Sequence, residues 1–302
     1  MNKKTTVNRW STASLPYLFI TPALLMIASF LFYPIANVFY YSFQTYNMSK
    51  PYYNGFAGLQ NFVKVFTDDP MFYSSLWISV KWVFVQVCLQ LVFGLLVALL
   101  LNQSFRVRWL FRTAAFLPWA ISGVIASLIW SNMLNENIGI INHLLMAAGL
   151  IHNKIAWTAN VHTVFGSVVI AEFWRGLPFF SITLLASLQT IPGELYESAK
   201  VDGAGRWKSF THVTLPYLKN TIILTTLLRT AWEFNNIDLI FNLTGGGPAH
   251  ATTTLTLYVA QLAVKSGDFG YGSAITVVTF CLLLIFSVVY LKISRFGKDD
   301  SQ

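Results

Sequence analysis

Long apolar segments, separated by short polar connections, set the pattern of this chain. A helix needs roughly 20 mainly apolar residues to cross about 30 Å of hydrocarbon. Six segments reach that length, at residues 17–43, 74–101, 113–134, 163–189, 217–243 and 272–292. The pattern predicts an all-α integral membrane protein with six transmembrane helices.

The composition favours a membrane environment. Hydrophobic residues make up 55% of the 302 residues and charged residues 11%, whereas a soluble domain contains about 25% charged residues. No polar block is long enough to form a separate soluble domain. We therefore predict a cytoplasmic N-terminal segment over residues 1–16, a transmembrane domain over 17–292 and a cytoplasmic C-terminal tail over 293–302.

Lysine and arginine are unevenly distributed among the connections. With the N-terminus inside, the outer connections hold only Lys50, Lys64, Lys154 and Lys265. The cytoplasmic side holds Lys3, Lys4, Arg9, Arg106, Arg108, Arg112, Lys200, Arg206, Lys208, Lys219, Lys292, Arg295 and Lys298. Because cytoplasmic connections are enriched in Lys and Arg, both termini are predicted to lie in the cytoplasm.

The connection over residues 190–216 is the longest and most polar one on the predicted cytoplasmic side. Pro192 ends the preceding apolar segment. Glu194 and Glu197 follow in the first turn of a new helix, where negative charge complements the helix dipole. Gly203 is expected to end this helix, because glycine readily adopts a left-handed conformation.

A second short helix is expected to carry Trp207 and Phe210 before the next apolar segment opens. The two helices then lie across the membrane surface and present three side chains to a partner, namely Leu195, Tyr196 and Ala199. A surface-lying amphipathic loop without a partner is the alternative interpretation.

The same connection contains a long and specific spacing of residues, which is Glu197-x-Ala199, then Gly203, then Val213-x-Leu215-Pro216. This spacing resembles the EAA loop of binding-protein-dependent importer permeases. Ser198 departs from the family pattern, which usually has a second alanine there. The resemblance implies a type I ABC importer permease architecture with a cytoplasmic EAA coupling helix that inserts into a groove of an ATPase subunit. The coupling residues that it implies are Glu194, Leu195, Tyr196, Glu197, Ala199, Asp202, Gly203 and Ala204.

The chain has no GxxxxGKS or GxxxxGKT phosphate-binding loop, so ATP hydrolysis is assigned to another polypeptide and no enzyme activity or cofactor to this one. The resemblance implies several partners: a second homologous permease subunit, two cytoplasmic ATPase subunits that bind ATP and Mg²⁺, and an extracellular solute-binding protein. It also implies location in a bacterial inner membrane.

Ionisable residues occur inside two apolar segments, where they are costly unless they pair or line a cavity. The fourth segment contains Glu172 and Arg175, and the fifth contains Arg229, Glu233 and Asp238. Helical spacing gathers them on two faces, one with Glu172, Gly176 and Phe179 and the other with Arg229, Trp232, Glu233 and Asn236. Aromatic and hydrogen-bonding groups together suit a sugar, which has apolar C–H faces and polar hydroxyls.

Residues 188–248, with Phe234-Asn235-Asn236 and the Thr244–Pro248 turn, resemble the larger permease of maltose-type importers. The resemblance implies that a carbohydrate, most readily an oligosaccharide, crosses by alternating access. It also implies that the substrate contacts are Glu172, Gly176, Phe179, Arg229, Trp232, Glu233 and Asn236. The charges at these positions leave open whether the cargo is neutral or acidic, such as a uronate whose carboxylate binds Arg229.

Several alternatives stay open. Interhelical salt bridges, for instance Glu172 with Arg229, would hold the bundle together without touching substrate. Glycerol 3-phosphate or another small polyol is an alternative cargo. An ion-coupled secondary transporter would contain inverted repeats and broken helices, and the sequence indicates neither.

The remaining polar residues of the apolar segments are not assigned to the substrate site. Gln86 and Gln90, four residues apart, are typical of contacts between membrane helices. Asp238 is assigned to an outer gate or to a structural turn. The five histidines show no metal-ligand spacing and no nucleophile motif is present, so we predict neither a catalytic nor a metal site.

Overall fold

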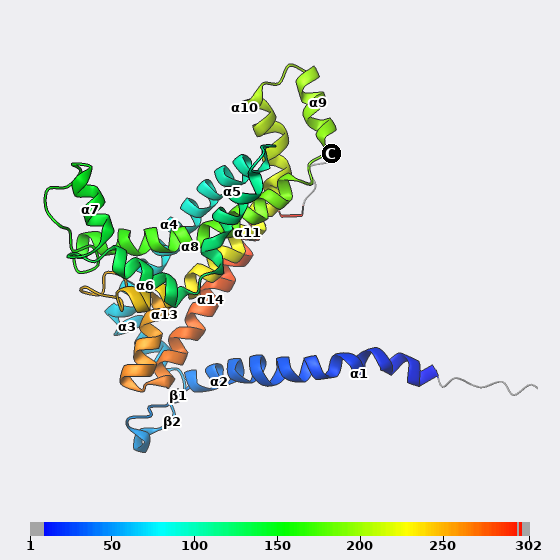
Figure 1. Ribbon diagram of the computed structural model, residues 1–302. Coiled ribbons are helices and arrows are strands. Elements are labelled where there is room, and N and C mark those ends of the chain that lie inside the picture. Colours follow the sequence, from blue (N-terminus) through cyan, green and yellow to red (C-terminus); the bar gives the residue numbers. More distant parts are fainter. Residues whose placement is uncertain (1–8, 295, 298–302) are drawn as a thin grey trace, which may run out of the picture. The chain divides into compact units, whose positions relative to one another are not determined.

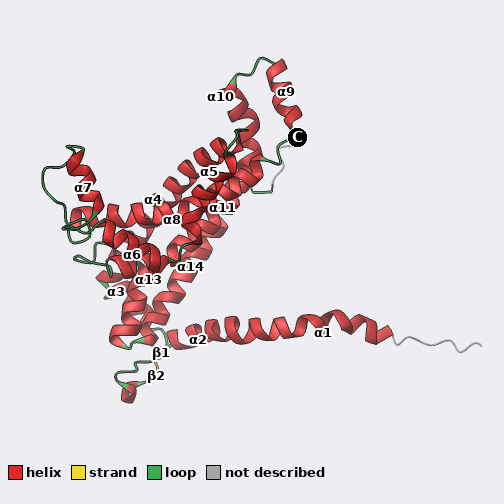
Figure 2. Cartoon of the chain, viewed as in Figure 1, coloured by secondary structure: helices red, strands yellow, loops and turns green. Residues whose placement is uncertain are grey.

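The computed structural model describes residues 9–294, 296 and 297 (Figure 1). Predictions that concern residues 1–8, 295 and 298–302 lie outside the described residues. They include the positions of Lys3, Lys4, Arg295 and Lys298 and the outer parts of both terminal segments. Figure 2 shows that loops connect the helices of the described chain. The described residues also form a two-stranded sheet.

The chain divides into two compact units, and one helix, α14 (Phe269–Ile293), passes from the first to the second. The first unit comprises residues 1–69 and 261–280. It contains α1 (Arg9–Ile27), a π-helical turn (Ala28–Phe32), α2 (Tyr33–Ser42), β1 (Gln44–Thr45), a 3₁₀ turn (Pro51–Tyr53), β2 (Gly55–Phe56), α3 (Gln60–Thr67), a second π-helical turn (Leu262–Ser266) and the start of α14.

Buried polar contacts hold the first unit together. Strands β1 and β2 are antiparallel, with Gln44 opposite Phe56. The buried amide of Asn61 donates to the carbonyl oxygens of Ser42 at 3.0 Å and Gln44 at 2.9 Å. These bonds fix the chain where α2 ends, because backbone carbonyls that leave a helix need new donors.

The second unit comprises residues 70–260 and 281–302. It contains α4 (Pro70–Asn102), α5 (Arg108–Phe116), a 3₁₀ turn (Leu117–Ala120), α6 (Gly123–Met133), α7 (Ile140–Ala147), α8 (Val161–Leu188), α9 (Gly193–Val201), α10 (Arg206–Ser209), a π-helical turn (Phe210–Thr214), α11 (Leu215–Asn235), α12 (Asp238–Leu243), α13 (Leu255–Gln261) and the end of α14. Helices α4, α8 and α11 pack on one another and form its centre (Figure 1).

Glycine allows the closest approach within this centre. A Cβ atom built on Gly94 of α4 would lie 2.5 Å from Cβ of Phe180 on α8. Phe180 and Leu184 of α8 are fully buried. A larger residue at position 94 would therefore push the two longest helices of the unit apart.

Four of the six predicted spans are confirmed, because four helices are long and apolar enough to cross a membrane: Tyr17–Ser42, Pro70–Asn102, Val161–Leu188 and Phe269–Ile293. The predicted third span is a pair of helices, Arg108–Ala120 and Gly123–Met133, bent by 100°. If this bent pair is counted as one span, the described residues contain five spans. Helix α11, in the predicted fifth span, does not meet the same measure of length and apolarity, and it carries Arg229 and Glu233.

The expectation of unbroken helices is wrong at two places. Between α5 and α6 the backbone is extended at Ile121 and Ser122, and the Ser122 hydroxyl accepts the N–H of Ile125 at 3.3 Å, which caps α6. Helix α11 ends at Asn235, and Asn236 is extended with ψ 113° before α12 begins. Hydropathy alone misses such breaks, because apolar residues continue on both sides of each.

The prediction that only two apolar segments carry charged residues is also wrong. Lys81 lies within α4, and its Nζ lies 4.1 Å from the ring centroid of Phe165 on α8. A cation over an aromatic face is stabilised by the ring quadrupole. This contact stabilises the positive charge of Lys81 where α4 packs against α8.

Candidate functional site

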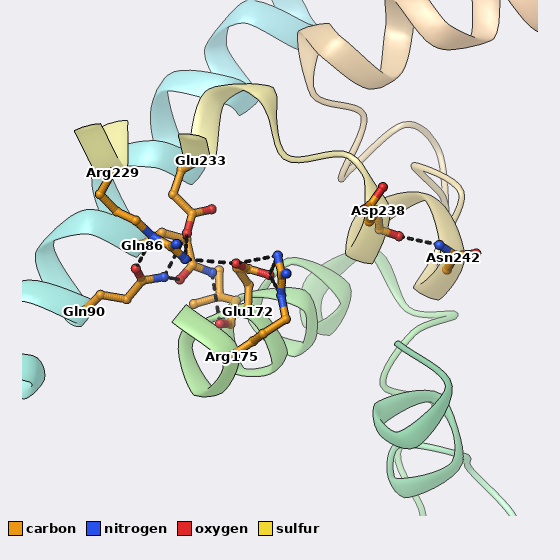
Figure 3. Close-up of polar contacts among 9 residues, drawn as sticks. Gln86, Gln90, Glu172, Arg175, Arg229, Glu233, Asp238 and Asn242 are labelled. Carbon is orange, nitrogen blue, oxygen red and sulfur yellow. Dashed lines mark hydrogen bonds and ion pairs between the residues drawn. The ribbon is translucent and has the colours of Figure 1, made fainter. Parts of the chain in front are cut away.

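Three helices of the second unit bring six polar side chains together (Figure 3). Helix α4 contributes Gln86 and Gln90, α8 contributes Glu172 and Arg175, and α11 contributes Arg229 and Glu233. Residues i and i+4, or i and i+3, share one helix face. Each helix therefore presents two neighbouring side chains to the same interior point.

Arg229 is at the centre of this cluster. Its Nη2 atom lies 3.1 Å from Oε1 of Glu172 and 2.6 Å from Oε1 of Glu233. Its Nε atom donates to Oε1 of Gln90 at 2.7 Å. One guanidinium thus joins α4, α8 and α11.

The two glutamines extend the cluster across α4. The Gln90 amide donates to Oε1 of Glu233 at 2.9 Å and to Oε1 of Gln86 at 3.0 Å. The Gln86 amide in turn donates to the carbonyl oxygen of Val169 on α8 at 3.0 Å. Both glutamines are fully buried. They therefore join α4 to α8 and α11, as polar side chains between membrane helices do.

Arg175 completes the cluster from the same helix as Glu172. Its Nε donates to Oε2 of Glu172 at 2.9 Å and its Nη2 to Oε1 at 3.0 Å, a fork-like pairing. The side chain of Glu172 has 0% exposure and that of Arg175 has 21%. Arg175 thus connects the buried cluster to open space.

The formal charges of the cluster cancel. Glu172 and Glu233 are paired with Arg175 and Arg229, two negative charges with two positive ones. Buried charges are tolerated when they are paired and hydrogen-bonded. Among the described residues, however, Oε2 of Glu233 has no hydrogen-bond partner although it is buried.

Gly176 makes room for the arginine. A Cβ atom built on Gly176 would collide with Nη2 of Arg229 and Nε2 of Gln90. The glycine is one turn from Glu172 on the same face of α8. The close approach of α8 to the cluster therefore depends on the missing side chain.

A cavity of about 380 Å³ borders the cluster. Its lining combines charged, amide and aromatic side chains: Trp119, Arg175, Arg229, Ala231, Trp232, Glu233, Asn235, Asn236 and Asp238. Such convergent polar groups with aromatic walls are typical of small-molecule sites.

The structure places the seven predicted substrate residues in two layers. Arg229, Trp232, Glu233 and Asn236 line the cavity. Three others do not line it and pack behind it in the bundle, namely Glu172, Gly176 and Phe179, all buried. Phe179 joins the layers, because its ring lies 5.1 Å from that of Trp232, measured between centroids. Trp232 is 49% exposed, so its ring has a free surface.

Seven residues at the cluster or cavity fall outside the predicted site: Gln86, Gln90, Trp119, Arg175, Ala231, Asn235 and Asp238. The spacing of Gln86 and Gln90 predicted a polar face on α4. It did not predict that this face contacts α8 and α11. Trp119 comes from the bend between α5 and α6, which the apolar pattern concealed. Asp238 begins α12, and its Cβ lies 2.9 Å from a Cβ built on Gly123, so it packs at a structural turn and also lines the cavity.

The connection over residues 190–216 begins with helix α9, and Gly203 beyond its end has φ 76°. Helix α10, the π-helical turn and α11 then follow without a break, so the expected second short helix is continuous with α11. The hydroxyls of Tyr196 and Thr214 lie 2.9 Å apart and tie α9 to this helix. Val201 and Trp207 are more exposed, at 88% and 75%, than Leu195.

These features define a helical membrane protein with a polar, charge-balanced cavity among its helices. Residues 90–296 match the family described as binding-protein-dependent transport system inner membrane component. The chain belongs to this family.

Known proteins similar to the chain include two permeases. The trehalose/maltose transport system permease protein MalF of Thermococcus litoralis is 37% identical over 301 residues, covering 99% of each chain. The sulfoquinovosyl glycerol transport system permease protein SmoG of Agrobacterium fabrum is 35% identical, covering 93% of this chain and 90% of that protein.

A solved structure shares the fold. It is the bacterial alginate ABC transporter in complex with an alginate pentasaccharide-bound periplasmic protein, with a TM-score of 0.81 and 23% identity. The match covers 94% of this chain and 95% of the chain in that structure.

Proposed function

We propose that the chain is one permease subunit of an ATP-binding-cassette importer that carries an oligosaccharide without net charge. The family and the names of its relatives, which include a trehalose/maltose and a sulfoquinovosyl glycerol permease, support a carbohydrate cargo. Glycerol 3-phosphate and other small polyols are less favoured, because two tryptophans on one cavity suit the face of a sugar ring.

The observation that carries the proposal is the charge balance behind the cavity. Arg229 is already bonded to Glu172, Glu233 and Gln90. Arg175, the partly exposed cation on the cavity, is likewise paired with Glu172, so an acidic sugar would bring an uncompensated negative charge beside Glu233 and Asp238. A neutral sugar would meet no such repulsion, and its hydroxyls can bond to Arg175, Asn235 and Asn236 on the cavity wall.

The same ion pairs also stabilise the bundle. The predicted salt bridge between Glu172 and Arg229 is present, and both residues are buried. The structural interpretation and the substrate interpretation are therefore compatible. Buried pairs hold Arg229 and Glu233 in place, and Trp232 with the exposed part of Arg175 contacts the sugar.

The proposed assembly has the partners that the sequence predicts. It contains a second homologous permease, two cytoplasmic ATPase subunits holding ATP and Mg²⁺, and an extracellular solute-binding protein. The structural neighbour that contains a periplasmic protein supports the last of these. Six membrane-crossing segments are proposed, with α5–α6 and α11–α12 each crossing as a broken helix. Both termini then lie in the cytoplasm of a bacterial cell.

Helix α9 is proposed as the coupling helix, with Glu194, Leu195, Tyr196, Glu197, Ala199, Asp202, Gly203 and Ala204 at the ATPase. Leu195 and Val201 are exposed apolar residues on this helix, and Trp207 is exposed on α10. The bond from Tyr196 to Thr214 connects α9 to the continuous helix that carries Arg229 and Glu233. Closure of the ATPase dimer would thereby move one side of the ion cluster relative to α4 and α8.

The test is uptake into proteoliposomes that contain the assembled importer and its solute-binding protein. A neutral oligosaccharide should accumulate when ATP is present, and a uronate oligosaccharide should not. Glu233→Gln leaves Arg229 with excess positive charge, so neutral uptake should fall and the relative uptake of the uronate should rise. Glu136→Gln, on an exposed outer loop, is the matched control.

Two results would contradict the proposal. If no carbohydrate accumulates, the cargo of the importer is not a carbohydrate. Equal uptake of uronate and neutral sugars by the unaltered importer would remove the assignment to neutral cargo.

A further inference from the structure

A second cavity lies at the other end of α11 within the same unit. Its volume is about 560 Å³, which falls within the roughly 300–1,000 Å³ typical of ligand sites. It is enclosed by the ends of α4 and α8 and by the segment from α9 to the π-helical turn. The lining residues are Leu99, Asn102, Gln103, Leu188, Tyr196, Lys200, Ala204, Gly205, Arg206, Ser209, Phe210 and Thr214.

The charged groups on this cavity are all positive. Lys200 and Arg206 line it, and no Asp or Glu does. Among the described residues neither cation forms an ion pair, and the buried ion pairs of the unit lie in the cluster around Arg229. The connection after α4 adds Arg106, and the start of α5 adds Arg108. The cavity therefore favours an anion.

One wall of the cavity is apolar. Leu99, Leu188 and Phe210 form this wall. Leu96 and Leu100, on the neighbouring part of α4, are exposed. A ligand with both an anionic head and an apolar chain fits this combination better than a soluble anion, which would leave the leucines uncovered.

We propose that this cavity binds one acidic phospholipid. Its phosphate is held by Lys200, Arg206 and the Ser209 hydroxyl, and its acyl chain follows Leu99 along α4. The placement rests on the proposed topology, which puts these residues at the cytoplasmic surface, where anionic lipids and basic residues attract each other. The lipid would brace the segment around Tyr196 against α4, next to the proposed coupling helix.

The experiment measures lipid retained by the assembled importer in mild detergent, by native mass spectrometry. The probes are phosphatidylglycerol and phosphatidylcholine of the same chain length. The unaltered importer should retain one phosphatidylglycerol more tightly than phosphatidylcholine. Lys200→Gln with Arg206→Gln should weaken that retention roughly 25-fold, since each basic residue contributes roughly a factor of five. Lys208→Gln, on α10 but outside the lining, is the matched control and should retain the lipid.

The other outcomes overturn the proposal. Equal retention in the double variant, or equal retention of the two lipids, would show that the cavity does not select an acidic lipid. Displacement of the bound species by inorganic phosphate would assign the site to a soluble anion. Loss of the ATPase subunits from the double variant, with lipid retention unchanged, would assign these residues to a protein contact.

A neutral substitution covers the case in which the double variant fails to fold. Ser209→Trp fills the cavity without altering its charge and should also release the lipid. Lipid retention is measured without transport. The lipid proposal can therefore be tested even if the importer fails to take up any carbohydrate.

Discussion

Arg229 Nη2 lies 3.1 Å from Oε1 of Glu172 and joins α11 to α8 inside the bundle. The two residues are 57 positions apart in the sequence. Each carboxylate of the cluster has an arginine and each arginine a carboxylate, so charge can remain buried at this point. The exposed part of the cluster is mainly Arg175, which lines the cavity with 21% side-chain exposure, whereas the side chain of Glu233 is fully buried.

Removing the central arginine should destabilise the protein. Arg229→Met leaves Glu233 buried with only the amide of Gln90 as a partner. Breaking a buried ion pair costs about 3–5 kcal/mol, so the purified permease should unfold at a clearly lower temperature. The double variant Arg229→Met with Glu233→Gln removes the unpaired charge and should recover part of the loss. An unchanged unfolding temperature in the single variant would contradict the pairing.

A single methyl group on α8 should disturb the cluster. Gly176→Ala places a Cβ against Arg229 and Gln90, and overpacking of this kind costs about 1–3 kcal/mol. Transport should fall strongly while the protein still inserts. Gly166→Ala is the matched control on the same helix, because no described atom beyond the local backbone of α8 lies within 4 Å of its added Cβ. Equal activity of the two variants would argue against a tight contact at Gly176.

Loss of the hydroxyl on Tyr196 should weaken the link between α9 and α11. Tyr196→Phe removes the bond to Thr214, which is worth about 1 kcal/mol. We expect ATPase subunits to remain bound while sugar uptake per ATP hydrolysed decreases. Tyr217→Phe, at an exposed position on α11, should leave this ratio unchanged. An unaltered ratio in Tyr196→Phe would show that the bond does not transmit motion.

The loop that carries α7 should depend on one buried amide. The side chain of Asn142 donates to the carbonyl oxygens of Glu136 and Ile155, and accepts from Ile155 N–H and from Trp157 Nε1 at 2.9 Å. Asn142→Ala leaves these groups without their partner, at about 1–3 kcal/mol each if they stay buried. Limited proteolysis should then cleave residues 134–160 faster.

The matched control for this loop is Asn132→Ala. Among the described residues, the Asn132 amide donates only to the carbonyl oxygen of Leu128 within its own helix. Its loss should leave the cleavage rate unchanged. Equal cleavage of both variants would show that Asn142 does not organise the loop.

The sequence by itself determined the features that belong to one segment at a time. Apolar length predicted the helices Pro70–Asn102 and Val161–Leu188 to within a few residues. A glycine after a short polar helix predicted the positive φ of Gly203. These predictions succeed because hydrophobicity, helical period and backbone freedom are local properties.

Only the tertiary structure decided how the segments meet. The 100° bend between α5 and α6, which brings Trp119 to the cavity, leaves little trace in hydropathy. The bond from Arg229 to Gln90 joins residues 139 positions apart. Helical spacing placed each polar group on a face but could not choose its partner. The partner is set by how three helices pack, since inside a membrane each buried charge must find its counterpart on a neighbouring helix.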